Sequence, residues 1–228
     1  GAYAVQIDNP YIVTLCAFVC GSASTAVIVA ISRMRRDLGP GALVLAGVAL
    51  SSLFTGGSTL LQYFADDTQL GAVVFWTFGD LGSTNWHELA LLLAVDAAAL
   101  VYFLLKRWDY NAIHSGSDTA ASLGVNVRTV TLVSMAVCTV ASALAVSFVG
   151  IISFIGLVAP HAMRRFVGDD YRWLLPCSAA GGALLLILAD LVSRTLIAPT
   201  ILPVGAITSF LGAPVFLYLL LKGGARRA

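Results

Sequence analysis

Long apolar runs separated by short polar segments dominate the sequence. A helix needs about 20 apolar residues to cross the hydrocarbon layer of a bilayer, and seven runs reach or approach that length. The predicted spans are residues 11–32, 41–64, 88–106, 130–149, 151–166, 173–196 and 204–222. The fifth is short and contains proline, which indicates a broken or tilted span. The pattern therefore predicts an all-α polytopic transmembrane helix bundle, forming a single domain over residues 1–228.

Basic residues lie almost entirely on one side of these predicted spans. When successive spans cross in alternating directions, twelve of the 13 fall together: Arg33, Arg35, Arg36, Lys106, Arg107, Arg128, Arg164, Arg165, Arg172, Lys222, Arg226 and Arg227. Arg194 falls on the other side. An excess of Lys and Arg marks the cytoplasmic side of a membrane protein. We therefore expect a multi-pass protein of the cell (inner or plasma) membrane with a cytoplasmic carboxyl terminus.

Composition agrees with lipid as the main solvent. The chain is 59% apolar and 11% charged, whereas a soluble domain carries about 25% charged residues. A net charge of +1 gives no reason to expect nucleic acid as a partner. The four cysteines lie in apolar runs without a C-x-x-C spacing, so no metal site or cofactor is expected. The chain begins with Gly1 and shows no signal peptide, which predicts a start inside a longer protein, or processing.

One polar stretch stands apart from this pattern: D-T-A-A-S-L-G-V-N-V-R-T, residues 118–129. It belongs to a cytoplasmic interval, residues 110–129, between the third and fourth predicted spans. Asp118 favours a helix start because a carboxylate stabilises the helix dipole there, and Gly124 favours a left-handed helix end. Such a short helix at the membrane face is either a grip for a soluble partner or a connector that caps the bundle.

Several sequence blocks together carry a family resemblance. They are L-A-G-V-A-L at 45–50, A-A-S-L-G-V at 120–125, G-I-I-S-F-I-G-L-V-A-P-H-A-M-R-R at 150–165, A-D-L-V-S-R at 189–194, L-P-V-G at 202–205 and L-G-A-P-V-F-L-Y-L-L-L-K at 211–222. In this order and spacing the chain resembles the FecCD family, the membrane-spanning subunits of ABC importers for iron–siderophore complexes, haem and vitamin B12. These permeases have ten spans, so the resemblance implies that this chain supplies spans four to ten of a type II, vitamin B12 importer-like fold.

The resemblance implies three groups of functional residues. The loop after the family's sixth span couples the permease to its ATPase, which assigns coupling to Asp118, Ala120, Leu123, Gly124 and Val125. An arginine at the position of Arg194 docks the extracytoplasmic binding protein. The fifth and tenth spans line the translocation pathway, which assigns that role to Gly47, Ser51, Thr55, Gly205, Thr208 and Gly212. Implied partners are a second permease, as homodimer or heterodimer, two ABC ATPase subunits, the binding protein and membrane lipid.

The residues themselves leave alternatives open at several of these positions. Asp190 and Arg194 share a helix face, so Arg194 serves either an ion pair near the interface or binding-protein docking. Small residues in spans indicate close helix packing as readily as a pathway. Asp96 lies mid-span, where a buried hydrogen bond is favoured over a proton relay. His161 follows Pro160 at a helix break, and structural packing is favoured over a metal ligand.

The expected function is transport without covalent chemistry by this chain. The sequence contains no phosphate-binding G-x-x-x-x-G-K-[ST] motif, so energy from ATP has to arrive through contact with a separate ATPase. The expectation is therefore a permease subunit of an ATP-binding-cassette importer for iron–siderophore, haem or cobalamin-type chelates, which forms the translocation pathway as a dimer. An ion-coupled secondary transporter or channel is the alternative, although it would need paired intramembrane charges. An intramembrane protease is a remote third class.

Overall fold

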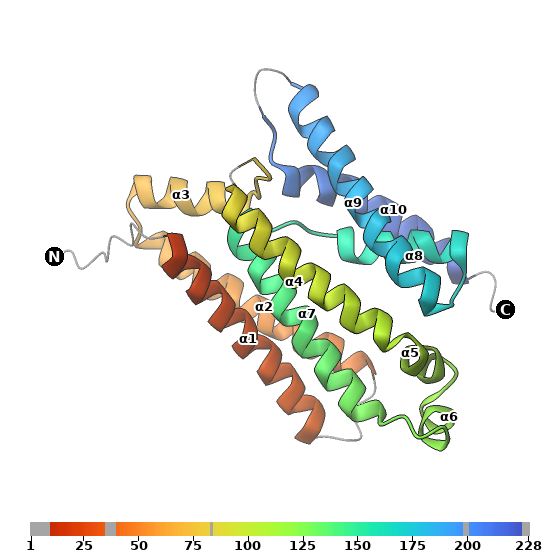
Figure 1. Cartoon of the computed structure of the whole chain (residues 1–228). Helices are drawn as coiled ribbons and strands as arrows, with labels where there is room; N and C mark the ends of the chain where they lie inside the picture. Colours follow the sequence, from red (N-terminus) through yellow and green to blue (C-terminus); the bar gives the residue numbers. More distant parts are fainter. Residues whose placement is uncertain (1–9, 35–39, 83, 198–200, 225–228) are drawn as a thin grey trace.

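The structure is a computed structural model that describes residues 10–34, 40–82, 84–197 and 201–224. These residues are almost entirely helical (Figure 1). The helices are α1 (Pro10–Met34), α2 (Pro40–Tyr63), α3 (Asp67–Thr77), α4 (Trp86–Leu105), α5 (Arg107–His114), α6 (Ser117–Ser122), α7 (Val127–Val149), α8 (Ile155–Val167), α9 (Tyr171–Thr195) and α10 (Val204–Gly224). The all-α prediction is confirmed, and a helix occupies each of the seven predicted spans.

Three of these helices are long and apolar enough to cross a membrane within the described residues: α4, α7 and α9. Helices α1 and α10 contain shorter apolar stretches, Leu15–Ile28 and Val204–Tyr218. Helix α8 has only 13 residues, or about 20 Å of helix, and the non-helical residues 150–153 precede it. The fifth predicted span is therefore broken, as its short apolar run indicated, but the break lies at residues 150–153. The helix break expected at Pro160 is wrong, because Pro160 lies inside α8.

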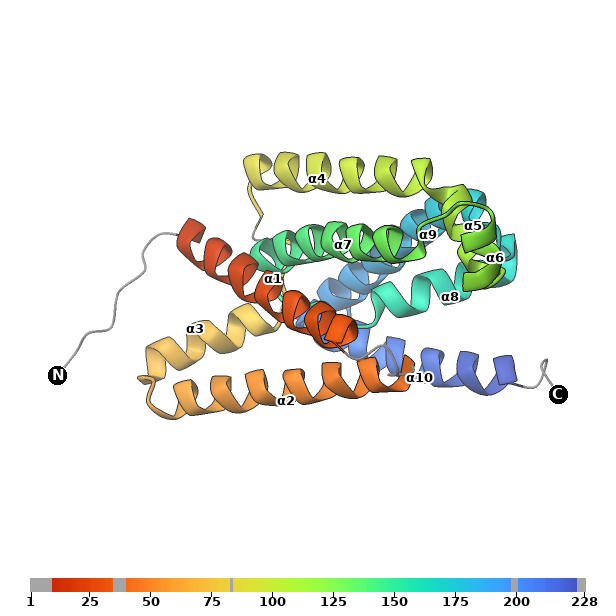
Figure 2. The same cartoon turned by 90° about the horizontal axis from the view of Figure 1, so that it is seen from below.

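The bundle consists of two packed groups (Figure 2). In the first, α7 packs between α1 and α4, and α2 lies against α1. In the second, α8, α9 and α10 pack on one another. Contacts between α4 and α9 join the two groups. Helices α5 and α6 lie together at the end of the bundle where α4 ends and α7 begins.

Helix boundaries follow local sequence signals. The Glu88 carboxylate accepts the Asn85 N–H at 2.9 Å before α4, and the Asn126 side chain accepts the Thr129 N–H at 3.1 Å at the start of α7. Gly150 and Gly168 follow α7 and α8 with φ values of 79°, a conformation that glycine adopts without steric cost. The side-chain caps satisfy N–H groups at helix starts, and the Gly150 and Gly168 N–H groups donate to the Val146 and Arg164 carbonyls at helix ends.

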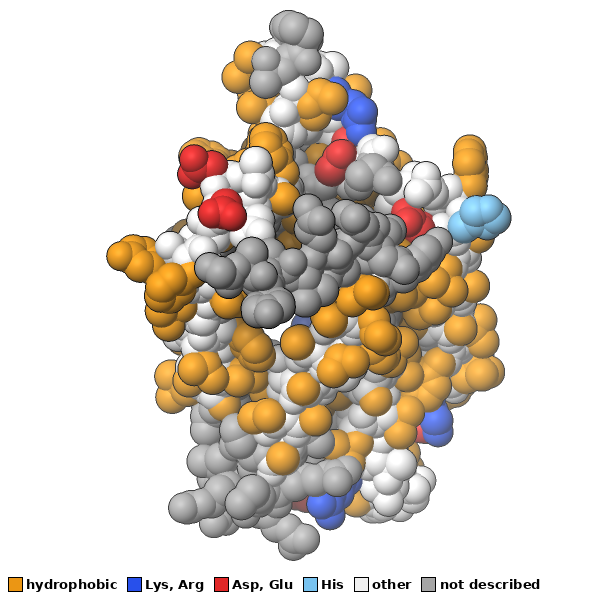
Figure 3. Space-filling model, turned by 90° about the vertical axis from the view of Figure 1, so that its left-hand side faces the viewer, with side chains coloured by type: hydrophobic (Ala, Val, Ile, Leu, Met, Phe, Trp, Pro, Cys, Tyr) orange, Lys and Arg blue, Asp and Glu red, His pale blue; other side chains and the backbone are white. Residues whose placement is uncertain are grey.

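Apolar side chains cover the outside of the bundle. Figure 3 shows a broad hydrophobic belt, with charged side chains towards its upper and lower ends. Exposed large residues include Leu53, Leu61, Leu93, Leu184, Ile187 and Phe210. A soluble monomer seldom exposes so large a contiguous apolar surface, whereas a lipid-embedded bundle requires one. The surface therefore agrees with the membrane-spanning interpretation of α4, α7 and α9.

Candidate functional site

The polar stretch forms the short helix and glycine turn expected from its sequence. Helix α6 carries Asp118 in its first turn, and Gly124 has a φ of 82°. The Gly124 N–H donates to the Ala121 carbonyl and the Val125 N–H to the Ala120 carbonyl, both at 3.0 Å. This pair of bonds is the Schellman arrangement that ends a helix on a left-handed residue. The predicted helix end is confirmed, and residues 127–129 form the start of α7.

The five predicted coupling residues differ in their accessibility. Ala120 is fully buried, so it fixes α6 to the bundle and is not available to a partner. Leu123 is 68% exposed, and Asp118 and Gly124 are also exposed, whereas Val125 is half-buried. The available surface therefore consists of an apolar side chain, a carboxylate and a glycine turn at the tip of the segment. Their role in coupling stays a prediction.

Helix α5 is a second short helix at this end, and it follows the predicted third span, residues 88–106, where no helix was expected. Its Asn111 side chain contacts the start of α9 twice: Nδ2 donates to Asp170 Oδ1, and Oδ1 accepts the Tyr171 N–H, both at 2.9 Å. Asp170 also caps α9 by accepting the Arg172 N–H at 2.9 Å. The Arg172 N–H and the Asn111 amide lower the pKa of Asp170, because both donors favour its charged form.

Aromatic residues extend this contact between α5 and the spans. The Tyr110 ring lies 5.7 Å from the Tyr171 ring, centroid to centroid, and the Tyr110 hydroxyl lies 2.5 Å from Ser134 Oγ of α7. Burial raises the pKa of Tyr110 to about 12, so this hydroxyl keeps its proton at physiological pH. Arg172 stacks over the Trp108 ring at 5.3 Å.

At the opposite end of the bundle, Arg194 forms the ion pair that its spacing predicted. Its Nε lies 2.8 Å from Asp190 Oδ2, with the arginine side chain 43% and the aspartate side chain 25% exposed. The guanidinium also approaches the loop after α3, because a Cβ atom built at Gly82 would lie 3.2 Å from Arg194 Nη2. Asp80 Oδ1 accepts the Gly82 N–H at 2.8 Å in the same loop. The pair is therefore present, and part of the guanidinium stays accessible from outside the bundle.

Three backbone segments meet closely beside this ion pair. The Asp80 N–H donates to the Val149 carbonyl at 2.9 Å, and the Gly205 N–H to the Phe78 carbonyl at 3.1 Å. A Cβ atom at Gly150 would lie 2.5 Å from the Trp76 carbonyl oxygen, and one at Gly205 would lie 2.6 Å from the Ile151 oxygen. We call this contact of residues 76–80, 149–151 and 204–205 the glycine junction. Its glycines allow a backbone approach that any side chain would prevent.

The predicted pathway residues fall into two separate groups. On α10, Gly205 belongs to the glycine junction, Thr208 is buried, and a Cβ atom at Gly212 would lie 2.5 Å from Phe154 Cβ. On α2, Ser51 and Thr55 are exposed and Gly47 is half-buried. The α10 residues are therefore closely packed against other parts of this chain, as the alternative interpretation expected, whereas the α2 residues remain accessible. A role of either group in a pathway stays a prediction.

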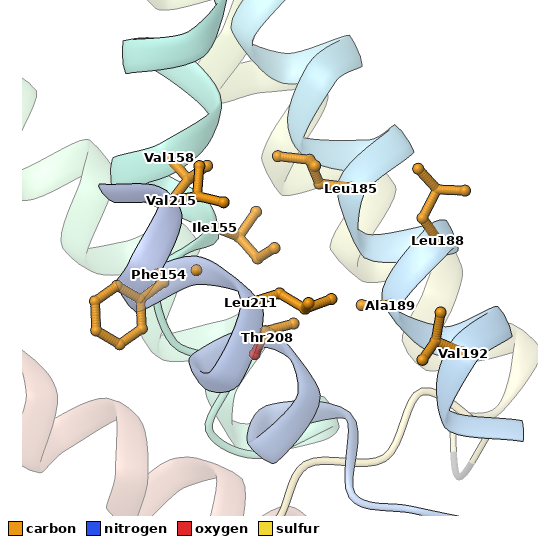
Figure 4. A pocket seen from close by; sticks show the side chains of 11 residues that line it. Phe154, Ile155, Val158, Leu185, Leu188, Ala189, Val192, Thr208, Leu211 and Val215 are labelled. Carbon is orange, nitrogen blue, oxygen red and sulfur yellow. The ribbon is translucent and has the colours of Figure 1, made fainter. Parts of the chain in front are cut away.

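An apolar cavity between α8, α9 and α10 adjoins the buried α10 residues (Figure 4). Its lining is aliphatic apart from Phe154 and Thr208, and comprises Phe154, Ile155, Val158, Leu185, Leu188, Ala189, Val192, Thr208, Leu211, Gly212 and Val215. Phe154 has a φ of 66°, an uncommon value for a residue with a side chain. No local sequence pattern predicts this backbone conformation at Phe154.

Asp96 and His161 are titratable residues in predicted spans, for which a structural role was favoured over a proton relay and a metal ligand, respectively. Asp96 is exposed on α4, so the buried position expected for it is wrong. The His161 ring packs edge-on against Phe216 of α10, with centroids 6.0 Å apart, in agreement with structural packing. Among the described residues, no group of three or more His, Cys, Asp or Glu side chains could hold a metal ion.

Comparison with known proteins shows which proteins this chain resembles. Residues 2–222 match the model of the FecCD transport family. A Methanocaldococcus jannaschii protein named as an ABC transporter permease is 53% identical over 96% of this chain and 62% of its own length. The hemin transport system permease protein HmuU of Yersinia pestis is 38% identical over 93% of this chain and 63% of its own. The chain thus spans less than two thirds of either relative.

A solved structure agrees with these sequence matches. It is described as an inward-facing conformation of a metal-chelate type ABC transporter, and superposes with a TM-score of 0.80 at 28% identity. The match covers 95% of this chain and 76% of the other. Together with the apolar spans α4, α7 and α9, these comparisons show that the chain is a multi-pass membrane protein and belongs to the FecCD transport family.

Proposed function

We propose that this chain is the membrane-spanning permease subunit of an ATP-driven importer for a metal chelate of the iron–siderophore, haem or cobalamin class. The observation that carries the proposal is the membership of residues 2–222 in the FecCD transport family, whose relatives include a hemin permease and vitamin B12 import permeases. The fold supports it with a short helix, α6, that presents an exposed leucine next to a rigid turn at one end of the bundle.

The working arrangement follows from the two ends of the bundle. In this proposal the α5–α6 end is cytoplasmic, as is the carboxyl terminus, and it receives an ABC ATPase through Asp118, Leu123 and Gly124. The end containing Arg194 faces outward and receives a substrate-binding protein. Two permease subunits form the pathway between them, with gates at the ends of α2 and α10. Because the two ends of the bundle bind different partners, ATP hydrolysis on the cytoplasmic side can drive release of cargo that was received on the outer side.

An uptake measurement tests this proposal. The protein is co-reconstituted into vesicles with its ATPase and binding protein, and a panel of iron–siderophore, hemin and cobalamin is supplied. Accumulation of one chelate with ATP, and its loss with a non-hydrolysable analogue, is expected. Uptake that follows an ion gradient without ATP would contradict the proposal and favour a secondary transporter.

Reversal of charge at Arg194 is expected to weaken docking of the binding protein. Arg194→Glu places a carboxylate where an exposed guanidinium now offers its planar donors. Because a like-charge contact across an interface costs several kcal/mol and about 1.4 kcal/mol is a factor of ten, affinity should fall at least tenfold at low salt. Surface plasmon resonance on nanodiscs measures it.

The matched control is Arg164→Glu. Arg164 also forms an ion pair, with Asp169 Oδ1 at 3.0 Å, but it lies near the end of α8, close to the start of α9. In the proposed orientation this position is cytoplasmic, so docking from outside should be unchanged. Equal weakening by both substitutions would show a general effect of charge and remove Arg194 from the docking surface.

A further inference from the structure

The structure points to α5 as the mechanical connection between the coupling helix α6 and span α9, with Asn111 as its positioning residue. This inference rests on the proposed function, since it concerns how contact with an ATPase would reach the spans. It assigns a role to a helix, residues 107–114, to which the sequence analysis assigned none.

The contact pattern makes α5 an intermediate. Helix α6 packs on α5 and α7, and α5 in turn packs on α9, α4 and α7. A displacement of α6 therefore reaches α9 through α5, because α5 contacts both of these helices. Fully buried Ala120 fixes α6 to this assembly. The connection needs a rigid contact between α5 and α9 if motion is to be passed on and not absorbed.

Asn111 supplies that contact with both ends of its amide. Its donor binds Asp170 Oδ1 and its acceptor binds the Tyr171 N–H, each at 2.9 Å. Two hydrogen bonds from one planar group fix orientation as well as distance. The Tyr171 N–H belongs to the first turn of α9, where amide groups have no partner inside the helix. Asn111 thereby completes the cap of α9 from a different helix.

Further contacts restrict the rotation of α5 about this point. Ser134 Oγ donates to the Val130 carbonyl at 2.6 Å, so in its 2.5 Å contact with Tyr110 the tyrosine hydroxyl is the donor. The Trp108 ring lies under Arg172, which is the residue after Tyr171, one of the two contacts of Asn111. The joint therefore holds α5 to two spans, α7 and α9, on different sides. With these contacts α5 moves together with the two spans, so a displacement of α6 is passed on to α9.

The test compares Asn111→Asp with a compensating double substitution. The single change places a carboxylate against Asp170 and removes the only amide donor of the pair, so it should open the joint. In the double variant with Asp170→Asn, an amide at position 170 again faces a carboxylate at position 111, which should restore most of the contact. Asn126→Asp is the matched control, because Asp caps a helix as well as Asn and the helix that Asn126 caps is α7.

Two measurements on the full transporter decide the outcome. Spin labels at exposed Thr119 on α6 and Leu184 on α9, in a background without the four cysteines, report the α6–α9 distance distribution. We expect a narrow distribution that broadens in Asn111→Asp and narrows again in the double variant. We also expect transport per ATP hydrolysed to fall at least about fivefold, the lower end of typical coupling between sites, with ATPase copurification unchanged.

The failures of the two proposals are distinguishable. An unchanged distance distribution and unchanged transport per ATP in Asn111→Asp would overturn the role of α5 and leave the importer function intact. Loss of ATPase copurification in that variant would also overturn it, because Asn111 would then belong to the docking surface. Absence of ATP-dependent uptake by the unaltered protein would refute the proposed function, and the distance measurement would still test the joint.

Discussion

Replacement of Leu123 by glutamate is expected to abolish copurification of the ATPase with the permease. Leu123 is 68% exposed at the end of α6, and burying a leucine side chain at an interface contributes roughly 1.5–3 kcal/mol. The substitution removes this contribution and adds a charge without a partner. Since about 1.4 kcal/mol is a factor of ten, the ATPase affinity should fall well over tenfold. Pull-down from detergent extracts measures it directly.

Leu196→Glu provides the control for this experiment. Leu196 is similarly exposed, at 63%, but it follows α9 at the other end of the bundle. It should therefore leave ATPase binding unchanged. Gly124→Glu is a less direct probe, because the φ of 82° at Gly124 strains any residue with a side chain. ATPase binding by Leu123→Glu at the level of the unaltered protein would remove α6 from the interface.

Gly150→Ala is expected to cause a large loss of stability. The added methyl group would lie 2.5 Å from the Trp76 carbonyl oxygen and 2.9 Å from Gly79 Cα, and the φ of Gly150 is 79°. The backbone of Gly150, with φ 79° and ψ −164°, lies in a region used essentially by glycine alone and costs another residue roughly 1–3 kcal/mol, and overpacking against fixed atoms adds roughly 1–3 kcal/mol. A loss of about 3 kcal/mol in the free energy of unfolding should follow. Thermal unfolding in detergent would show a strongly lowered midpoint.

The matched substitution is Gly56→Ala on α2. No atom lies within 4 Å of a Cβ built there, and the residue is helical. Alanine exceeds glycine in helix propensity by about 1 kcal/mol, so the midpoint should stay constant or rise slightly. A midpoint for Gly150→Ala equal to that of Gly56→Ala would show that the glycine junction opens without cost.

The spans and the α6 turn were predictable because their signals are local. Apolar length defines α4, α7 and α9, and a single glycine after a short polar helix predicts the left-handed turn at Gly124. The structure also keeps the ion pair of Asp190 and Arg194, since residues four apart on a helix are neighbours. Each of these features depends on a window of fewer than about two dozen residues, so sequence pattern is sufficient.

The glycine junction and the α5 joint were not predictable in the same way. Gly205 is constrained by carbonyls of Phe78 and Ile151, and Asn111 by a cap 59 residues away. Nothing in the local pattern distinguishes a glycine that permits backbone contact from one that lines a pathway. The helix α3, with apolar and polar residues mixed around it, also lacked a periodic signal. Long-range contacts decide these roles, and they become visible only in the fold.

Labelling of a cysteine at position 119 tests the central claim most directly. Thr119 is exposed on α6, and α6 has to face the cytoplasm if an ATPase on that side is to contact it. A membrane-impermeant maleimide, applied to a variant whose native cysteines are replaced, should react with Thr119→Cys in inside-out vesicles and leave intact cells unlabelled. Reaction in intact cells before permeabilisation would place α6 outside and contradict energy input through this helix.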